Sequence, residues 1–290
     1  MYVDHVLQAD KGAEKRKKKA DKKAAALAGF LGAKASRAEK KATKKFGVDT
    51  RQDVAYKAAA LKGQAQQVAE DKGCEEIHSF ATSAVRDATN CDDVLADVAR
   101  RTGVQVRVLS GHDEARLTSL AVRRWYGWSA GRILALDIGG GSLEISNGVD
   151  EEPDVALSLP LGAGRLTREW LPDDPPGRRR VAMLRDWLDA EIAPAAARLQ
   201  AVGTPDLVAG TSKTMRTLAR LTGAAPSSAG PRVKRTLTAR GLSQLIAFIS
   251  RMTESDRREL DGLSSDRAGQ IVAAGPLEAC DALEQNPPTR

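Results

Sequence analysis

Residues 133–148 read Ile133-Leu-Ala-Leu-Asp-Ile-Gly-Gly-Gly-Ser-Leu-Glu-Ile-Ser-Asn-Gly148. Two short apolar runs flank four small residues, a pattern that predicts two antiparallel strands joined by a turn. A nucleotide-binding crossover of the Gly-x-Gly-x-x-Gly type needs a helix after the glycines, whereas Leu-Glu-Ile-Ser alternates like a strand. The bland alternative, a tight turn that binds nothing, stays open.

Period-two alternation sorts the side chains of this hairpin onto two faces. If the turn is centred on the glycines, Ile138 faces Leu143, and Asp137 faces Glu144. Two carboxylates directly opposite each other lie about 5 Å apart and repel. A cation between them or a polar ligand above them best explains such a pair.

The turn beside the carboxylates offers backbone N–H groups with no side chains in the way, which suits phosphate. Hard oxygen ligands favour Mg²⁺, so we expect the carboxylates of Asp137 and Glu144 to hold this ion. The expected phosphate-binding residues of the turn are Gly139, Gly140, Gly141 and Ser142.

Composition indicates a globular protein of one large or two ordinary domains in its 290 residues. No apolar run approaches the roughly 20 residues of a membrane span, and the N-terminus lacks the apolar core of a secretion signal. Three widely spaced cysteines without a Cys-x-x-Cys motif suit a reducing compartment. We therefore expect a cytoplasmic protein.

The positive charge is concentrated at the N-terminus. Residues 1–50 hold 14 Lys and Arg against 6 Asp and Glu, a local charge of +8, and the remainder holds 31 against 32. Few large apolar residues occur there, so we expect 1–72 to form a basic arm, helical or disordered. Residues 11–45 could bind polyanions non-specifically by counterion release. A solvated tail is the equal alternative, because no aromatic residues interleave with the lysines.

Two further strand-to-helix junctions precede the hairpin. Residues 77–83 read as a strand followed by a helix whose first turn contains Arg86. The planar guanidinium of this residue could grip phosphate, or it could pair with Asp87 or Asp93.

The second junction is Ser110-Gly-His-Asp113, a capping pattern that opens a helix over 114–126. Glu114 stands in its first turn, after a strand at 104–109. A carboxylate placed there could activate water for attack on phosphate. Alternatively, Glu114 is only a favourable first-turn residue.

Beyond the hairpin we expect a strand at 155–160, a helix at 181–200 and a further strand-to-helix turn in Leu207-Val-Ala-Gly-Thr-Ser-Lys-Thr214. Thr211 or Ser212 caps that helix, and the free N–H groups offer a second anion site. Helices follow at 240–252 and about 266–274.

Five motifs in order resemble the exopolyphosphatase and guanosine pentaphosphate phosphohydrolase family. The similarity covers about 74–275, and five motifs in sequence are far more specific than one. The motifs are Phe80-Ala-Thr-Ser-Ala-Val-Arg-Asp-Ala-Thr-Asn90, Leu109-Ser-Gly-His-Asp-Glu-Ala-Arg116, Leu136-Asp-Ile-Gly-Gly-Gly-Ser-Leu-Glu144, Leu159-Pro-Leu-Gly-Ala-Gly-Arg165 and Gly210-Thr-Ser-Lys-Thr214.

The resemblance implies an α/β fold with two ribonuclease-H-like lobes of the actin and sugar-kinase type. It implies that Glu114 is the base for the attacking water, that Asp137 and Glu144 serve Mg²⁺ and phosphates, and that Arg86 contacts phosphate. The implied activity is a hydrolase that removes terminal phosphate from inorganic polyphosphate or from guanosine penta- or tetraphosphate.

Two departures from the family pattern bear on this activity. The family's first phosphate hairpin, Asp-x-Gly-Ser-Asn, has no counterpart in 1–72, and its closing Leu-Arg-Glu-Gly segment is missing beyond Gly275. We therefore expect an incomplete first lobe and a depressed rate, because phosphoryl transfer depends on positioning and charge compensation. The expected divisions are 1–72, the arm with a helix capped by Gly73; 73–131, a partial first lobe; 132–280, the second lobe; and 281–290, a tail.

The leading hypothesis is an exopolyphosphatase, and two alternatives compete with it. One is a non-catalytic relative that captures polyphosphate or nucleic acid with its lysine arm. The other is a rearranged relative whose first lobe cannot fold alone. The sequence leaves the oligomeric state open between a monomer and a homodimer.

Overall fold

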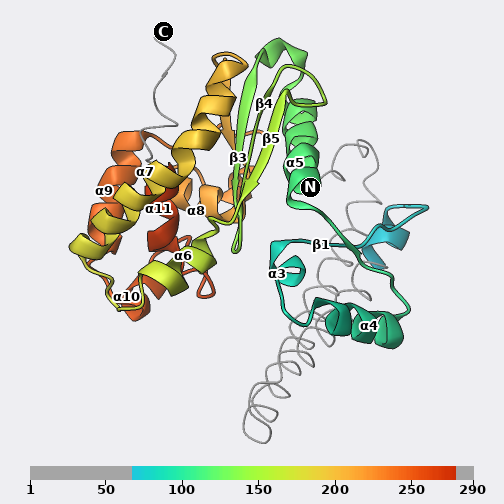
Figure 1. Ribbon diagram of the computed structural model, residues 1–290, viewed down its shortest axis with the longest axis horizontal. Coiled ribbons are helices and arrows are strands. Elements are labelled where there is room, and N and C mark those ends of the chain that lie inside the picture. The colour runs from blue at the N-terminus through green and yellow to red at the C-terminus, as the bar shows by residue number, and fades with distance from the viewer. Residues whose placement is uncertain (1–66, 279–290) are drawn as a thin grey trace, which may run out of the picture. The chain divides into compact units, whose positions relative to one another are not determined.

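The computed structural model describes residues 67–278 and divides into two compact units. The described part of the first unit comprises 67–81 and 87–108, and that of the second comprises 82–86 and 109–278. The expectations for the basic arm at 11–45 and for the tail at 281–290 lie outside the described residues. Helices and strands carry the labels of Figure 1.

The described part of the first unit contains a helical segment at 67–71, a complete helix and one pair of very short strands. Helix α4 (Cys91–Thr102) ends on Gly103, whose φ of 67° is left-handed, as the sequence predicts for a C-cap. Strands β1 (Phe80–Ala81) and β2 (Arg107–Val108) pair in parallel. The sequence predicts longer strands over 77–83 and 104–109. A two-stranded pair has little sheet to support it, which limits its length.

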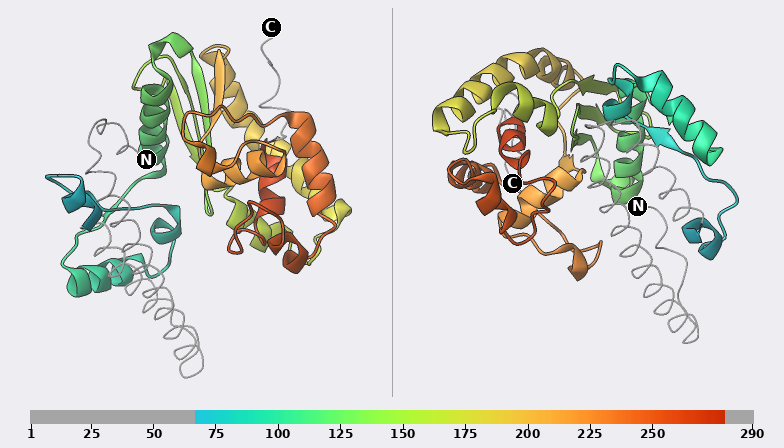
Figure 2. Two further views of the ribbon diagram at one scale, coloured as in Figure 1. Left: turned by 180° about the vertical axis from the view of Figure 1, so that it is seen from behind. Right: turned by 90° about the horizontal axis from the view of Figure 1, so that it is seen from below.

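The second unit is built around a four-stranded sheet. Its order is β5-β4-β3-β6, with β3 antiparallel to β4, β4 antiparallel to β5, and β3 parallel to β6. Helix α5 lies against one face, and a layer of helices that includes α7 and α8 covers the other (Figures 1 and 2). The strands are β3 (Ile133–Ile138), β4 (Leu143–Gly148), β5 (Val155–Leu159) and β6 (Leu207–Gly210). The helices are α3 (Ser83–Arg86), α5 (Gly111–Tyr126), η1 (Trp128–Ala130), α6 (Ala163–Trp170), α7 (Arg178–Ala201), α8 (Lys213–Leu221), η2 (Ser227–Ala229), α9 (Ala239–Ile249), α10 (Glu254–Arg258) and α11 (Ile271–Glu278).

Successive side chains of the hairpin point to opposite faces of this sheet, and residues on both faces are buried. Leu136 and Ile145 are buried in the main core, between the sheet and the helical layer. Ala135 points to the opposite face, where it joins Val122 of α5 in a smaller cluster. The period-two reading of the sequence is therefore confirmed, and both faces of the sheet are covered.

Capping side chains begin the helices that carry candidate site residues. Ser110 Oγ accepts a hydrogen bond from the N–H of Asp113 at the start of α5. Ser212 Oγ accepts one from the N–H of Met215 at the start of α8. Both caps are confirmed predictions, because a short polar side chain at this position satisfies an N–H group that the helix leaves free. Helix α10 was not predicted from its five residues.

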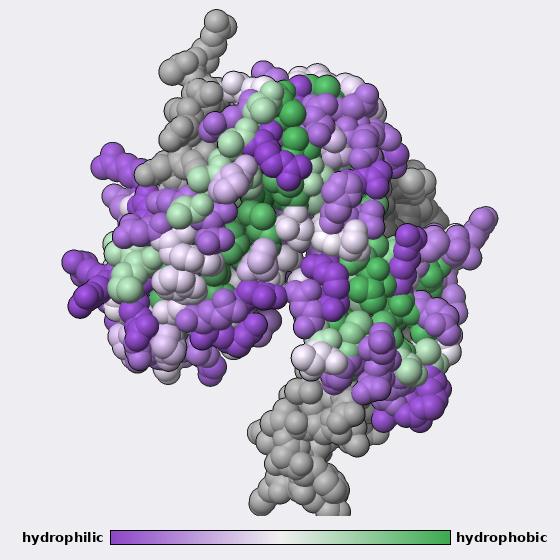
Figure 3. All heavy atoms as spheres, viewed as in Figure 1, coloured by the Kyte–Doolittle hydropathy of each residue, from purple (hydrophilic) through white to green (hydrophobic). Residues whose placement is uncertain are grey.

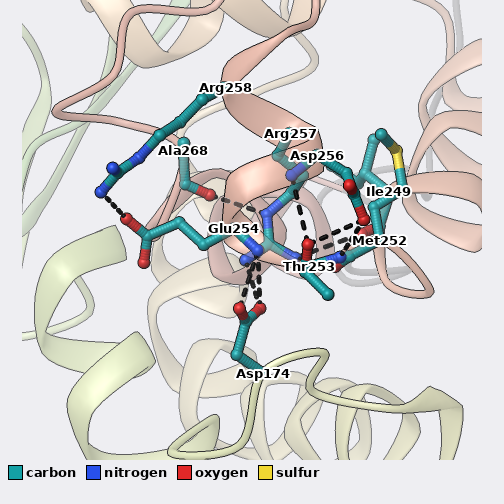
Figure 4. A network of polar contacts seen from close by, with 9 residues as sticks. All are labelled: Asp174, Ile249, Met252, Thr253, Glu254, Asp256, Arg257, Arg258 and Ala268. Atoms are coloured by element: carbon teal, nitrogen blue, oxygen red, sulfur yellow. Dashed lines mark hydrogen bonds and ion pairs between the residues drawn. The ribbon is translucent and has the colours of Figure 1, made fainter.

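A buried arginine ties the loop after α6 to α10 (Figure 4). The side chain of Arg257 is 3% exposed, and its guanidinium donates to Asp174 Oδ1 at 3.1 Å. It also donates to the carbonyl oxygens of Ala268, Ile249 and Met252. Asp174 in turn accepts the N–H of Glu254, the first residue of α10. One carboxylate thus pairs with a buried charge and with a helix N-terminus.

The helical layer of the second unit presents mainly hydrophilic side chains to solvent, with hydrophobic side chains showing in patches between them (Figure 3). This distribution is typical of helices that bury one stripe against a sheet. Within residues 67–278, no helix is long and apolar enough to cross a membrane.

Replacing Asp174 with alanine should destabilise the second unit by about 2 kcal/mol, because the buried guanidinium of Arg257 would lose a hydrogen bond to a carboxylate that is itself 44% exposed. The matched control is Asp173→Ala, whose carboxylate pairs with Arg180 at the surface. It should cost less than about 1 kcal/mol. Urea unfolding followed by circular dichroism measures both, and equal midpoints for the two variants would contradict the assigned role.

Candidate phosphate and metal site

The two hairpin carboxylates lie opposite each other, as predicted. Asp137 of β3 pairs in register with Glu144 of β4, one step from the glycine turn. Glu144 is 3% exposed, and its Oε1 accepts a hydrogen bond of 2.8 Å from Ser158 Oγ of β5. Asp137 Oδ2 accepts one of 2.6 Å from Thr211 Oγ1. A hydroxyl of β5 therefore orients Glu144, and a hydroxyl of the loop after β6 orients Asp137.

Burial acts on both carboxylates, and like charge acts on Glu144 as well. Burial, with a smaller contribution from the charges of Glu114 and Asp137, raises the pKa of Glu144 to about 6 against the opposing effect of nearby hydroxyls. Burial also raises the pKa of Asp137. Within residues 67–278, no Lys, Arg or His forms an ion pair with either side chain. An external cation can therefore balance the charge of this pair.

The glycine turn is exposed at Gly140, where an added Cβ would meet nothing within 4 Å. The carbonyl oxygen of Gly139 accepts the N–H of Ala163 at 2.9 Å, and that of Gly140 accepts the N–H of Arg165 at 3.0 Å. Within the described chain, the N–H groups of Gly140 and Gly141 donate to no protein acceptor. An anion can therefore take them up.

Two more features of the turn fit a bound oxyanion. Ser142 is 3% exposed, and its buried Oγ has no hydrogen-bond partner among the described residues. It lies near enough to Glu144 to lower the pKa of that carboxyl, but without hydrogen-bond geometry. A Cβ on Gly141 would stand 2.8 Å from Ser83 Oγ, and one on Gly162 would stand 2.4 Å from the backbone of Gly141. Close packing, and not a left-handed backbone, requires glycine at these two positions.

Arg86 and Glu114 form an ion pair beside the hairpin. Arg86 Nη1 donates to Glu114 Oε2 at 3.3 Å and to the carbonyl oxygen of Leu109 at 3.0 Å. Burial raises the pKa of Glu114, Arg86 opposes that rise, and the charge of Asp137 adds to it. The two side chains are 24% and 19% exposed, so both remain accessible to a ligand.

The start of α5 brings this ion pair to the hairpin carboxylates. A Cβ on Gly111 would lie 2.5 Å from Ser158 Oγ and 3.7 Å from Arg86 Nη2. Ser158 is the residue that donates to Glu144. The structure therefore gathers Arg86, Glu114 and the carboxylate pair in one place within the second unit.

Gly111 and Ser158 were missed by sequence reasoning. Ser158 is the one polar residue of the β5 strand, Val-Ala-Leu-Ser-Leu, and its register partner is Glu144. That polar interruption was the available signal. Gly111 gave none, because its role depends on how closely α5 approaches β5.

The hydroxyls of the second strand-to-helix turn already have protein partners. Ser212 Oγ caps α8, and Thr211 Oγ1 donates to Asp137. The N–H of Thr211 donates to the carbonyl oxygen of Leu136 at 3.0 Å. The phosphate-binding roles of Thr211 and Ser212 stay predictions, and the direct effect of Thr211 is to orient Asp137.

The donor set suits Mg²⁺ better than a metal held by protein alone. Within residues 67–278, no group of three His, Cys, Asp or Glu side chains could hold a metal ion by itself. Mg²⁺ usually takes one or two carboxylates and completes its octahedron with water and substrate phosphates. The paired oxygens of Asp137 and Glu144 beside the glycine turn meet that requirement.

Solved structures show which fold the chain has. A Ppx/GppA family member from Aquifex aeolicus aligns with a TM-score of 0.65 at 24% identity, covering 84% of this chain and 78% of that one. An exopolyphosphatase from Cytophaga hutchinsonii aligns with a TM-score of 0.66 at 21% identity, covering 79% and 75%. The chain therefore has the α/β fold of the actin and sugar-kinase type that the sequence predicted.

Residues 35–284 match the Ppx/GppA phosphatase family, and the chain belongs to that family. This confirms the resemblance seen in the five motifs. The chain is 73% identical over 207 residues to Exopolyphosphatase 1 of Mycobacterium tuberculosis, covering 71% of this chain and 60% of that protein. It is 69% identical over 219 residues to Exopolyphosphatase 1 of Mycobacterium leprae, covering 76% and 65%. It thus spans less than two thirds of the length of these relatives.

Removing the charge of Glu144 should change how stability depends on pH. Because the pKa is about 6 in the fold and ordinarily 4.5, the folded state binds the proton more tightly. The free energy of unfolding should therefore fall by about 2 kcal/mol as pH rises from about 3.5 to about 7 without metal. Glu144→Gln should lack this contribution.

Urea titrations in EDTA at closely spaced pH values measure the difference between the two proteins. Glu151→Gln is the control, because that carboxylate pairs with Arg124 at the surface. Parallel pH profiles for the wild type and Glu144→Gln would show that burial does not perturb this carboxyl.

Proposed function

We propose that this chain is a Mg²⁺-dependent exopolyphosphatase that releases terminal phosphate from inorganic polyphosphate. The observation that carries the proposal is the pair of Glu144, which is buried, and Asp137, which is half-buried. Within residues 67–278 this pair has no basic partner, and the neighbouring N–H groups of Gly140 and Gly141 have no protein acceptor. The two relatives at 73% and 69% identity, both named Exopolyphosphatase 1, support the choice of substrate.

In this proposal the glycine turn binds the terminal phosphate. The N–H groups of Gly140 and Gly141 donate to its oxygens, and the buried hydroxyl of Ser142 supplies a further donor. Arg86 adds a guanidinium to the same anion. Mg²⁺, when bound by Asp137 and Glu144, supplies charge compensation for the phosphates. The negatively charged polyphosphate is thereby held beside two carboxylates that would otherwise repel it.

Glu114 acts as the general base. Its carboxylate takes a proton from water while the water oxygen bonds to the terminal phosphorus. The bond between that phosphorus and the bridging oxygen breaks, and the bridging oxygen leaves with the shortened polyphosphate. Burial raises the pKa of Glu114 and so brings it closer to the pH at which the enzyme works, which favours proton transfer from water. When a phosphate draws Arg86 away, the guanidinium lowers that pKa less, so substrate binding itself strengthens the base.

Guanosine penta- and tetraphosphate are the second substrate class. They end in the same phosphoanhydride group, which the turn and the carboxylates would hold in the same way. The described site favours neither substrate through its terminal phosphate, so preference must arise from contacts further along the ligand. We place either activity in the cytoplasm, which the cysteine pattern of the sequence supports.

A non-catalytic polyanion-binding protein is the competing function. It is favoured by the local charge of +8 in residues 1–50. Binding would then rest on lysine counterion release and weaken steeply with salt.

Replacing Glu114 with glutamine should lower phosphate release from long-chain polyphosphate by about 100-fold or more, because a general base contributes at least that much. The control is Glu151→Gln, a surface substitution of the same chemistry. Released phosphate is measured with Mg²⁺ present, alongside circular dichroism of each protein.

Equal rates for the wild type and Glu114→Gln would contradict the catalytic proposal. A wild-type protein that binds polyphosphate without releasing phosphate, and loses that binding at high salt or on deletion of 1–50, would establish the competing function.

A further inference from the structure

Arg165 contacts the glycine turn with both its backbone and its side chain. Its N–H donates to the carbonyl oxygen of Gly140, and its Nε donates to that of Gly141 at 3.2 Å. Together with the N–H of Ala163 on Gly139, these bonds occupy all three glycine carbonyls. Arg165 closes the motif Leu159-Pro-Leu-Gly-Ala-Gly-Arg165, which the proposed function has not yet used.

We propose that Arg165 is a positioning residue, whose guanidinium fixes the last peptide unit of the glycine turn so that its N–H faces the bound phosphate. The inference rests on the proposed function of this turn as the phosphate site.

The planarity of the peptide bond makes each carbonyl bond also a constraint on an N–H. In a trans peptide the C=O of one residue and the N–H of the next point in opposite directions and move as one unit. Holding the carbonyl of Gly139 therefore aims the N–H of Gly140, and holding that of Gly140 aims the N–H of Gly141. Holding the carbonyl of Gly141 aims the N–H of Ser142.

Only the last of these three constraints depends on a side chain. The first two carbonyls are held by backbone N–H groups of Ala163 and Arg165, which any residue except proline supplies. The Gly141 carbonyl is held by Arg165 Nε. The same peptide leads into Ser142, whose buried Oγ has no hydrogen-bond partner in the part of the chain that the structure describes. The side chain of Arg165 thus controls the part of the turn nearest Glu144.

The start of α6 packs closely against the glycine turn. A Cβ on Gly164 would lie 3.0 Å from the carbonyl oxygen of Gly140, and one on Gly162 would meet the turn backbone at 2.4 Å. Two glycines therefore let the start of α6 approach the turn closely enough for Nε to reach Gly141. A preorganised amide binds an anion without first paying to reorient its dipole.

Lysine and methionine at this position separate the hydrogen bond from the charge. Lysine keeps a positive charge but carries a methylene in place of Nε, and methionine loses both. If Nε acts by holding the carbonyl, Arg165→Lys and Arg165→Met should be equally impaired. Arg168→Met is the matched control, because that side chain is exposed on the same helix.

The first measurement needs no ligand. Backbone ¹H–¹⁵N spectra should show a large change of the Ser142 amide signal in both Arg165 variants and little change for Gly140, whose peptide is held by Ala163. The second is calorimetric binding of tripolyphosphate with Mg²⁺, which both variants should weaken by about tenfold or more. Arg168→Met should match the wild type in both.

An unchanged Ser142 signal in both Arg165 variants would overturn the inference, as would wild-type affinity in Arg165→Lys, which would assign the effect to charge alone. If the wild-type protein itself failed to bind tripolyphosphate, the proposed function would fall. The Ser142 and Gly140 signals would still report whether Arg165 holds the turn.

Discussion

Two carboxylates held opposite each other in a buried part of a sheet are the constraint on which this site depends. The register of β3 and β4 faces Asp137 with Glu144, and burial raises the pKa of both. Within the described chain no basic side chain pairs with them, so the fold leaves negative charge uncompensated. Such an arrangement lowers the stability of the free protein and provides a preformed binding site for a cation. The other features of the site follow from the need to place a phosphate against that cation.

The surrounding elements meet this need by close backbone contact. Glycines at 141 and 162 let α3 and the start of α6 approach the turn, and the turn carbonyls are taken up on that side. The amide groups are left for an anion, next to the carboxylates that attract the metal. Helix α5 then places Glu114 near both, with Arg86 as a partner that an incoming phosphate can compete for. Charge attraction and preorganised dipoles thus act on one ligand.

Local patterns were enough to predict the hairpin, its register and the caps of α5 and α8. Period-two alternation and a run of glycines fix which residues face each other, and capping depends on neighbours three residues away. The contacts that bring the site together were not predictable in this way. Ser158 on Glu144, Gly111 against Ser158 and Arg165 on Gly141 each join segments 14 to 47 residues apart, and depend on how closely elements approach. The short strands β1 and β2 show the same limit, since their length depends on support from a sheet.

The most direct test of this account is the titration of the Glu144 carboxyl carbon by ¹³C NMR, with and without saturating Mg²⁺. Without the ion, the account predicts a midpoint near the raised pKa of about 6. With the ion, the midpoint should fall by about one pH unit or more, because an adjacent cation stabilises the carboxylate. The same midpoint in both titrations would contradict the claim that the paired carboxylates form a cation-binding site.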